Sequence, residues 1–267
     1  MDKQDTHPLP PIAALQALAA NAAKAILDIY YDETLISQVT FKQDASPLTL
    51  ADKASHAILV EGLKTLTPDI PVMSEESAVL PYEERKHWEY FWCIDPLDGT
   101  KEFLQRSDEF TINIALVHHQ QPVFGMIYVP VQRSCYYGSS REGTWRITSN
   151  GSPVRLHADN QAKDWTALGS RFHSSPEEQE MVKQYPISKT IAAGSALKFC
   201  LIAEGKAHFY YRHGPTMEWD TAAGQALVQF SGGKFTHPGG GAFLYNKESP
   251  LNGSFICSID PSKEYTP

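Results

Sequence analysis

The segment from residue 90 to residue 100 constrains this chain most, because an apolar run leads directly into a pair of aspartates. Tyr90–Ile94 is predicted to be a buried strand, and Asp95-Pro96-Leu97-Asp98-Gly99-Thr100 follows it. Pro96 has no N–H group, so we expect the strand to stop there. The turn then brings Asp98 back beside Asp95. The segment therefore predicts two neighbouring carboxylates at the end of a core strand.

Neighbouring carboxylates repel each other, which raises a pKa unless a cation neutralises them. Mg²⁺ prefers oxygen ligands and takes a few carboxylates together with water and phosphate. Gly99 lets the backbone approach an anion closely, and Thr100 is placed to begin a helix over residues 101–104 whose first N–H groups face a phosphate. An isolated D-x-x-D would be an ordinary turn. The complete string after an apolar strand favours a site for Mg²⁺ and phosphate.

Three more acidic residues fit this scheme. Glu75 follows the short apolar run Ile70–Met73, which predicts a second carboxylate at a strand end. Asp220 precedes a run of small residues, so we expect it to be the N-cap of a helix. Asp52 falls on a predicted helix. Taken alone, Asp220 would be a structural cap and Asp52 a solvated surface charge.

Length and charge exclude some classes of function. The 267 residues, 42% of them apolar, can form a sizeable core. The formal net charge of −8 argues against nucleic acid or a membrane surface as the main partner, because both favour basic faces. The four separated cysteines fit core thiols in a reducing compartment. With no predicted integral membrane segment, we expect a cytoplasmic protein and leave open peripheral contact with the inner face of the membrane.

Helices and antiparallel strands alternate along the chain, which predicts an α+β layered fold. The helix near residue 50 is expected to open at Ser46-Pro47, with proline near its first position. Helices are predicted over residues 10–35, 48–64, 195–204 and 220–230. Strands are predicted over residues 70–73, 90–94, 110–116, 123–129, 134–137, 144–147, 207–211 and 251–259.

At the acidic sites the sequence resembles the inositol monophosphatase superfamily. That superfamily is marked by a glutamate after a short strand, a D-P-[ILV]-D-G-T string and a late W-D, which match Glu75, Asp95–Thr100 and Trp219-Asp220 in order. Longer strings resemble the bacterial 3′(2′),5′-bisphosphate nucleotidase branch. These are KQDASPLTLAD (42–52), DPLDGTKEF (95–103), GSALKFC (194–200) and GPTMEWDTAAG (214–224).

The resemblance implies a single domain over residues 1–267, folded as a layered αβαβα sandwich of the inositol monophosphatase and fructose-1,6-bisphosphatase type. Its two lobes would span about residues 1–160 and 161–267, with two or more Mg²⁺ ions between them. The metal ligands that it implies are Glu75, Asp95 and the Leu97 carbonyl for an activating ion, and Asp95, Asp98 and Asp220 for a second ion.

The resemblance also implies a reaction. Thr100 and Asp52 would orient and deprotonate the water that attacks the 3′-phosphate of adenosine 3′,5′-bisphosphate, which gives AMP and phosphate. Such a 3′(2′),5′-bisphosphate nucleotidase, a phosphoric monoester hydrolase, would serve sulfur assimilation and nucleotide recycling. Li⁺ is expected to inhibit it by taking a Mg²⁺ position with too little charge. We expect this small nucleotide as partner, no nucleic acid, and a monomer or homodimer.

The reacting phosphate is expected on the N–H groups of Gly99 and Thr100. Ser195 is expected to be the N-cap of its helix, and together with Lys198 to hold a second phosphate or a ribose hydroxyl. Arg212 is a further anion-binding candidate; a plain cap and surface cations are the alternative. Phe172 and Phe243 depart from the expected pattern at places that could contact the nucleotide. The ten histidines show no zinc-binding spacing, and His118-His119 is assigned to a surface turn.

Three alternatives stay open. The first is an inositol monophosphatase or sugar bisphosphatase of the same superfamily, which Lys101-Glu102 and the GSALKFC string disfavour. The second is a haloacid-dehalogenase-like phosphatase, whose D-x-D-G-T spacing this chain lacks, because Pro96 and Leu97 separate the aspartates. The third is a nucleotide-sensing module, which would have no use for so many convergent carboxylates.

Overall fold

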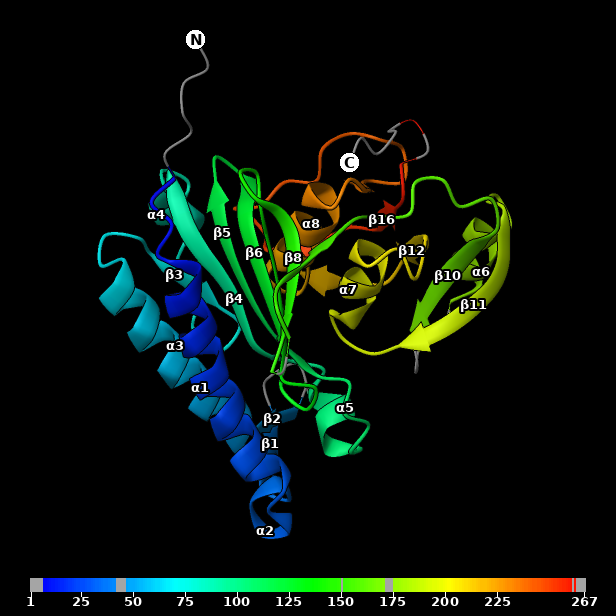
Figure 1. The fold of residues 1–267 in the computed structure, drawn as a ribbon. Coiled ribbons are helices and arrows are strands. Elements are labelled where there is room, and N and C mark those ends of the chain that lie inside the picture. Colours follow the sequence, from blue (N-terminus) through cyan, green and yellow to red (C-terminus); the bar gives the residue numbers. More distant parts are fainter. Residues whose placement is uncertain (1–6, 42–46, 150, 171–174, 261, 263–267) are drawn as a thin grey trace.

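Layers of helix and sheet alternate across the molecule (Figure 1). The computed structural model describes residues 7–41, 47–149, 151–170, 175–260 and 262. The helices are α1 (Ile12–Tyr30), α2 (Glu33–Ile36), α3 (Leu50–Leu66), α4 (Tyr82–Arg85), α5 (Thr100–Leu104), α6 (Pro176–Val182), α7 (Leu197–Ala203) and α8 (Glu218–Phe230).

The first sheet has seven strands in simple sequence order, β3 to β9. Only the β3–β4 pair is parallel; each later strand runs antiparallel to the one before it. Its strands are β3 (Val72–Ser74), β4 (Tyr90–Asp98), β5 (Thr111–His118), β6 (Gln121–Val129), β7 (Ser134–Ser139), β8 (Gly143–Thr148) and β9 (Val154–Leu156).

The second sheet is mixed and has five strands in the order β11-β10-β12-β16-β14. They are β10 (Trp165–Ser170), β11 (Ile187–Ala193), β12 (Phe209–Arg212), β14 (Lys234–Thr236) and β16 (Phe255–Ser258). Two small ribbons complete the fold, namely β1 (Val39–Phe41) with β2 (Pro47–Thr49), and β13 (Thr216–Met217) with β15 (Leu251–Asn252).

The layers follow the order helix, sheet, helix, sheet, helix. Helices α1 and α3 pack together on one face of the first sheet, and α8 covers the opposite face, where it contacts β4 to β7. Helix α7 lies beside α8, which also reaches β14 and β16, while α6 contacts β12 in the second sheet. A Cβ at Gly125 of β6 would lie 2.4 Å from the Ala223 carbonyl oxygen, so glycine permits this close approach of α8. The predicted αβαβα sandwich is confirmed.

Strand β4 shows how side-chain alternation aims the functional residues. Trp92 and Ile94 belong to the core beneath α1 and α3, whereas Phe91 and Cys93 belong to the core that α7 and α8 share. Successive side chains of a strand point to opposite faces, so Asp95 continues the row of Phe91 and Cys93. That row faces α8, whose first turn carries Asp220.

Several element boundaries differ from the sequence prediction. Pro47 lies in β2 rather than in a helix, and Thr49 caps α3 with its hydroxyl. Strand β4 does not stop at Pro96 but continues to Asp98, because a register shift against β5 accommodates the proline there. The prediction missed β9, β10, β11, β14 and α6. Much of β11 is exposed, so its sequence lacks the regular apolar alternation of a half-buried strand.

Helix α1 is long and apolar. By length and hydropathy alone it could cross a membrane, and it is the single helix with this property in the described part of the chain. Leu15, Ala19, Ala22 and Ile26 are buried in the core that α1 shares with α3. The helix therefore forms an outer layer of the sandwich.

Candidate active site

Three carboxylates converge where β3, β4 and α8 meet. One oxygen each from Glu75, Asp95 and Asp220 lie within 4.8 Å of one another. Asp95 is 1% exposed, and the other two are partly buried. Oxygen atoms this close, with no cation among them, repel each other strongly in a setting of low dielectric.

Hydrogen bonds with backbone groups position each of these three residues. The amide of Glu75 donates to the Ile94 carbonyl at 3.2 Å, which holds the end of β3 against β4. Asp95 accepts from the Leu97 amide at 3.0 Å through its own Oδ1. Asp220 accepts from the Met217 amide at 2.7 Å. Asp220 is thus the third residue of α8 and not its N-cap as predicted; the N-cap is Met217.

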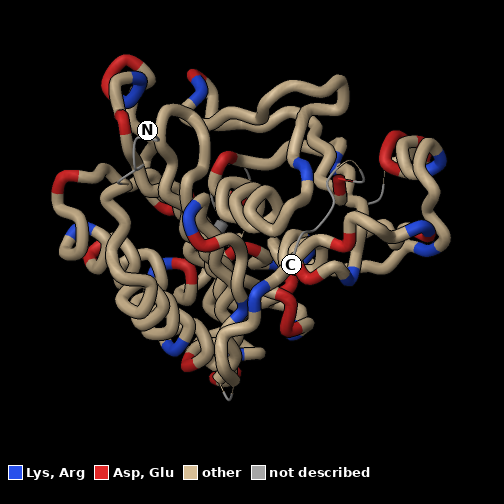
Figure 2. The backbone as a smooth tube through the Cα atoms, turned by 45° about the horizontal axis from the view of Figure 1, so that its top comes forward, with Lys and Arg blue, Asp and Glu red and all other residues tan. Residues whose placement is uncertain are grey.

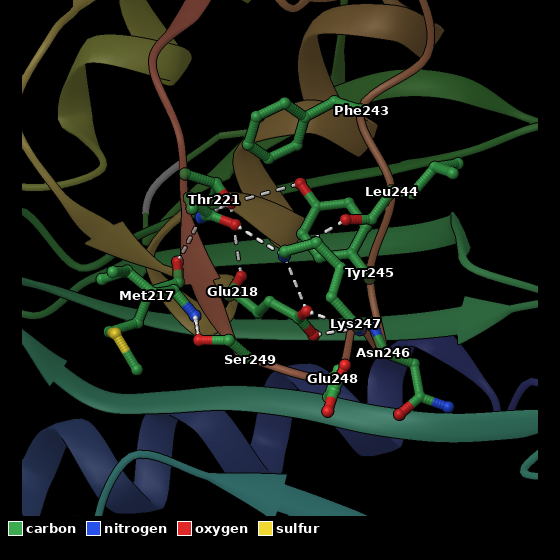
Figure 3. A network of polar contacts seen from close by, with 12 residues as sticks. Met217, Glu218, Thr221, Phe243, Leu244, Tyr245, Asn246, Lys247, Glu248 and Ser249 are labelled. Atoms are coloured by element: carbon green, nitrogen blue, oxygen red, sulfur yellow. Dashed lines mark hydrogen bonds and ion pairs between the residues drawn. The ribbon is translucent and has the colours of Figure 1, made fainter. Parts of the chain in front are cut away.

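A buried polar network holds the first turn of α8 in place (Figure 3). Glu218 is fully buried and accepts from the amides of Asn246 and Lys247, at 2.7 and 3.0 Å. The Lys247 ammonium also pairs with Glu218 at 2.7 Å. Asn252 donates to the Met217 carbonyl at 2.7 Å. The residues around Asp220 are therefore braced by side chains that do not belong to the acidic cluster.

Asp98 lies beside this trio but is turned toward β5. It accepts from Thr111 at 3.4 Å and from Asn113 at 3.3 Å, and among the described residues it is not one of the three within 4.8 Å. Burial raises the pKa of Asp98 to about 6, against the opposing effects of the Lys198 charge and the Asn113 hydrogen bond. Asp98 is therefore close both to the acidic cluster and to Lys198, which lines the cavity described below.

The cluster fits a divalent cation because burial and neighbouring negative charges disfavour the ionised forms of Asp95 and Asp220. Burial is the largest cause that raises the pKa of Asp95, and the charges of Glu75, Asp98 and Asp220 raise it further. Burial and the charge of Asp98 likewise raise the pKa of Asp220. A divalent ion with oxygen ligands would remove this repulsion. The donor set consists of carboxylate oxygens, with the carbonyl of Leu97 nearby, 3.5 Å from the Thr100 hydroxyl.

Asp52 and Thr100 come from distant parts of the sequence and meet at the edge of this cluster. The Thr100 hydroxyl donates to Asp52 Oδ1 at 3.3 Å. Asp52 Oδ2 accepts from the Thr49 amide at 2.7 Å and from the Thr49 hydroxyl at 2.5 Å. Burial raises the pKa of Asp52, which is 2% exposed and not the solvated charge that its helix position alone would indicate.

A cavity of about 210 Å³ opens beside the acidic cluster. Lys198 is 6% exposed, donates to the Ala193 carbonyl at 3.0 Å and lies over the Tyr210 ring. Burial lowers the pKa of Lys198 to about 8, while Asp98 and Glu102 oppose that shift. The cavity lining includes Asp98, Gly99, Lys101, Ser195, Lys198, Tyr210, Arg212 and Asp220.

Ser195 and Arg212 present unsatisfied polar atoms to this cavity. Ser195 Oγ and Arg212 Nε are buried and have no hydrogen-bond partner among the described residues. Ser195 does not cap α7 as predicted: Ala196 is the N-cap, and Ser195 has a positive φ of 44°. Its backbone turns there, so the hydroxyl lines the cavity. Gly99, with φ of 92°, is the N-cap of α5 and lies next to Ser195, where a Cβ on Gly99 would be 3.2 Å from the Ser195 Cβ.

The two departures from the expected pattern have different outcomes. Phe172 lies outside the described residues. Phe243 is 1% exposed and packs in the core against Phe235 and Phe255; Phe255 lines the cavity, but Phe243 is not one of the lining residues. The segment after it braces α8, as described above, and does not contribute to the cavity.

Sequence reasoning missed three residues that shape the site. Thr49 lies three residues before Asp52, and this spacing of a capping box could have revealed it. Asn113 is a polar residue in an otherwise apolar strand, opposite Asp95 in the β4–β5 register. Tyr210 lies in the predicted strand over residues 207–211, for which no functional role was expected, and its ring lies 5.3 Å from the Lys198 ammonium. No local pattern points to that last contact.

Comparison with known proteins finds relatives over nearly the whole chain. A model of the inositol monophosphatase family matches residues 9–265. A protein of Escherichia coli K12 named 3′(2′),5′-bisphosphate nucleotidase CysQ is 43% identical over 243 residues, which are 91% of this chain and 97% of that protein. The protein of the same name from Buchnera aphidicola is 38% identical over 90% of this chain and 89% of its own length.

Solved structures show the same architecture. CysQ from Bacteroides thetaiotaomicron, described as a bacterial member of the inositol monophosphatase family, is 36% identical with a TM-score of 0.81. That comparison covers 93% of this chain and 97% of the other. The Thermotoga maritima IMPase is 20% identical with a TM-score of 0.76, covers 94% and 92% of the two chains, and supports the fold alone.

Proposed function

This chain belongs to the inositol monophosphatase family, and we propose that it hydrolyses the 3′-phosphate of adenosine 3′,5′-bisphosphate with Mg²⁺ at the acidic cluster. The enzyme is a 3′(2′),5′-bisphosphate nucleotidase, a phosphoric monoester hydrolase of sulfur metabolism, since proteins of that name are up to 44% identical over 91% of the chain. One observation carries the substrate assignment: the acidic residues Asp98 and Asp220 and the cationic residues Lys198 and Arg212 line a single cavity. A substrate with two phosphates suits such a cavity, because cations at the carboxylates and the Lys198 and Arg212 side chains could each hold one phosphate.

The metal ligands in this proposal are Glu75, Asp95, Asp98, Asp220 and the Leu97 carbonyl. Oxygen donors of this kind favour Mg²⁺ over softer transition metals. Bound Mg²⁺ would neutralise phosphate charge and lower the pKa of an attacking water. The raised pKa values of Asp95 and Asp220 support this assignment, because a cation would offset both the cost of burying their charges and the repulsion from neighbouring carboxylates.

The proposed role of Thr100 and Asp52 is to orient the attacking water and take its proton. The Thr100 hydroxyl points at Asp52 Oδ1, and Thr49 holds the other carboxylate oxygen. Asp52 is therefore fixed in place with one oxygen committed to its own helix and one directed at Thr100. General-base arrangements of this kind contribute about 10²- to 10⁴-fold to a rate.

The second phosphate is proposed to contact Lys198 and Arg212, with the Ser195 hydroxyl as a further donor. With a pKa of about 8, Lys198 is mostly protonated at neutral pH. A phosphate in the cavity would give the buried Arg212 Nε and Ser195 Oγ the partners that they lack among the described residues. The amides of Gly99 and Thr100 are the proposed donors to the reacting phosphate.

The cytoplasm is the proposed location. All four cysteines are buried free thiols, which suits a reducing compartment. Charged residues of both signs are interspersed around the outer segments of the described chain (Figure 2). Small-molecule turnover fits this surface better than a task on nucleic acid.

A panel of phosphomonoesters tests the proposed function. Phosphate release is measured from adenosine 3′,5′-bisphosphate, AMP and inositol 1-phosphate, each with Mg²⁺ and with a chelator. We expect the bisphosphate to have the highest kcat/KM, 5′-AMP as the product, and no release in the chelator. Preference for inositol 1-phosphate would overturn the substrate assignment, and full activity in the chelator would overturn the metal assignment.

A further inference from the structure

A second group of metal-binding side chains lies at the opposite end of β4 from the acidic cluster. Glu89 immediately precedes β4, His118 is the last residue of β5, and His119 begins the turn to β6. One ligand atom from each of the three lies within 4.8 Å of the other two. Glu89 and the histidine pair are far apart in sequence, so no spacing rule for zinc sites could have joined them.

The β4–β5 register brings these residues together. Tyr90 pairs with His118, so the residues just beyond them, Glu89 and His119, continue the same ladder. The His119 amide donates to the Glu89 carbonyl at 3.1 Å. His119 and Gln120 both have positive φ, at 44° and 67°, as in the tight two-residue turns that join antiparallel strands. The backbone therefore fixes the relative positions of the three residues, from which their side chains extend.

Side-chain contacts restrict His118 further. Its ring stacks on Tyr90, with centroids 4.2 Å apart and an interplanar angle of 12°. His118 Nε2 lies 3.5 Å from Glu89 Oε1, and the His118 and His119 ring centroids are 4.1 Å apart. The His7 ring also packs edge-on against His118. His118 is thus held in place at 22% exposure, while Glu89, at 64%, has room to adjust.

We propose that Glu89, His118 and His119 bind one divalent transition-metal ion, with Zn²⁺ as the best match. Imidazole nitrogen favours zinc, nickel and copper, whereas Mg²⁺ favours oxygen ligands. Three protein ligands with a remaining open position are an established arrangement for zinc. Tetrahedral bonds of about 2.0–2.1 Å place ligand atoms about 3.3 Å apart, a contraction that the exposed Glu89 and His119 side chains allow.

The proposed zinc site is separate from the acidic cluster. Asp95 is six residues beyond Glu89 along the same strand, which corresponds to about 20 Å. Zinc at Glu89, His118 and His119 would join the start of β4 to the β5–β6 turn, and it would leave the reaction site untouched. This site is independent of the proposed function, because no residue is shared between them.

Calorimetric titration with Zn²⁺ tests the proposal. The protein is kept in millimolar Mg²⁺, which competes for the oxygen ligands of the acidic cluster, and the titration is repeated on Asp220→Asn. We expect one Zn²⁺ per chain in both proteins. His118→Ala and His119→Ala should each weaken that binding at least tenfold, roughly the scale reported for perturbed zinc sites. Glu89→Gln tests the carboxylate while keeping its shape.

His87→Ala is the matched control, since it removes an exposed histidine of the same segment that is not one of the three residues. It should bind Zn²⁺ as the wild type does. Equal affinity in wild type, His118→Ala and His119→Ala would overturn the site, as would Zn²⁺ binding that disappears in Asp220→Asn. The copper-loaded protein gives a second measurement: its electron paramagnetic resonance spectrum should show coupling to two imidazole nitrogens, reduced to one in His118→Ala, and a spectrum without nitrogen coupling in the wild type would contradict the assignment.

Discussion

The two ends of β4 carry the two proposed metal sites, which differ in donor atoms and in burial. At the carboxyl end, Asp95 is buried and joins Glu75 and Asp220 in a group of oxygen ligands. At the amino end, Glu89 is exposed and lies beside His118 and His119. The acidic cluster lies between the core and the cavity. Glu89, His118 and His119 lie where β4 begins and β5 ends.

The two clusters differ in how stable they are when no cation is bound. Buried carboxylates raise each other's pKa, so the acidic cluster destabilises the metal-free fold near neutral pH. The cluster of Glu89, His118 and His119 contains a single carboxylate, so it has no repulsion between carboxylates. The acidic cluster thus needs cations to be stable in its charged form, whereas the cluster of Glu89, His118 and His119 can exist without an ion at little cost.

The largest expected difference between the two ends is in turnover. Asp220→Asn keeps the shape of the side chain but removes a charged oxygen, so kcat for adenosine 3′,5′-bisphosphate should fall by about 10³-fold or more. His118→Ala should stay within about twofold of the wild type. Steady-state kinetics at saturating Mg²⁺ checks both variants. Near-normal turnover in Asp220→Asn would remove that residue from the metal site.

A smaller loss is expected when the proposed pair of Thr100 and Asp52 is broken and the proposed metal ligands are left intact. Thr100→Ala should lower kcat by about 10²-fold, because Asp52 then has no hydroxyl to orient. The Mg²⁺ concentration that gives half-maximal rate should change little. In a double mutant with Asp52→Asn the losses should not add, since both act through one hydrogen bond. Additive losses would show that the two residues act separately.

Lys198→Ala tests the proposed contact between Lys198 and the second phosphate. Charge-assisted contacts contribute about 1.5–3 kcal/mol, which is roughly ten- to a hundredfold in kcat/KM. The loss should appear with adenosine 3′,5′-bisphosphate and be small with a substrate that has one phosphate. The measurement is kcat/KM of wild type and variant on both substrates. An equal loss on the two would mean that Lys198 serves the fold or the chemistry instead.

The smallest expected effect is a pH-dependent stability of the metal-free protein. The pKa of Asp98 is raised to about 6, and a raised carboxyl pKa adds stability at low pH that is lost as pH rises through it. The melting temperature in a chelator should therefore fall by a few degrees between about pH 4 and pH 7 relative to Asp98→Asn. Mg²⁺ should reverse the fall. Glu89→Gln, at the other end of β4, should keep the wild-type slope.

Local sequence predicted the acidic cluster better than it predicted the cavity. Glu75 and Asp95 follow short apolar runs, and the structure brings them to one site, with Glu75 just after β3 and Asp95 three residues before the end of β4. Helix starts were less accurate: Asp220 and Ser195 were both expected to be N-caps, and neither is. Capping preferences are weak where tertiary contacts decide the boundary, as the bracing of Glu218 by the 246–247 segment shows.

The sequence by itself determined the types of side chain and their nearest neighbours: aspartates after an apolar strand, a glycine and threonine behind them, and a layered α+β fold. These features depend on alternation and turn chemistry within a few residues. Only the tertiary structure decided that Thr100 meets Asp52, that Lys198 is buried over Tyr210, and that Glu89 joins a histidine pair. Such contacts depend on strand register and helix packing between distant segments, which no local pattern encodes.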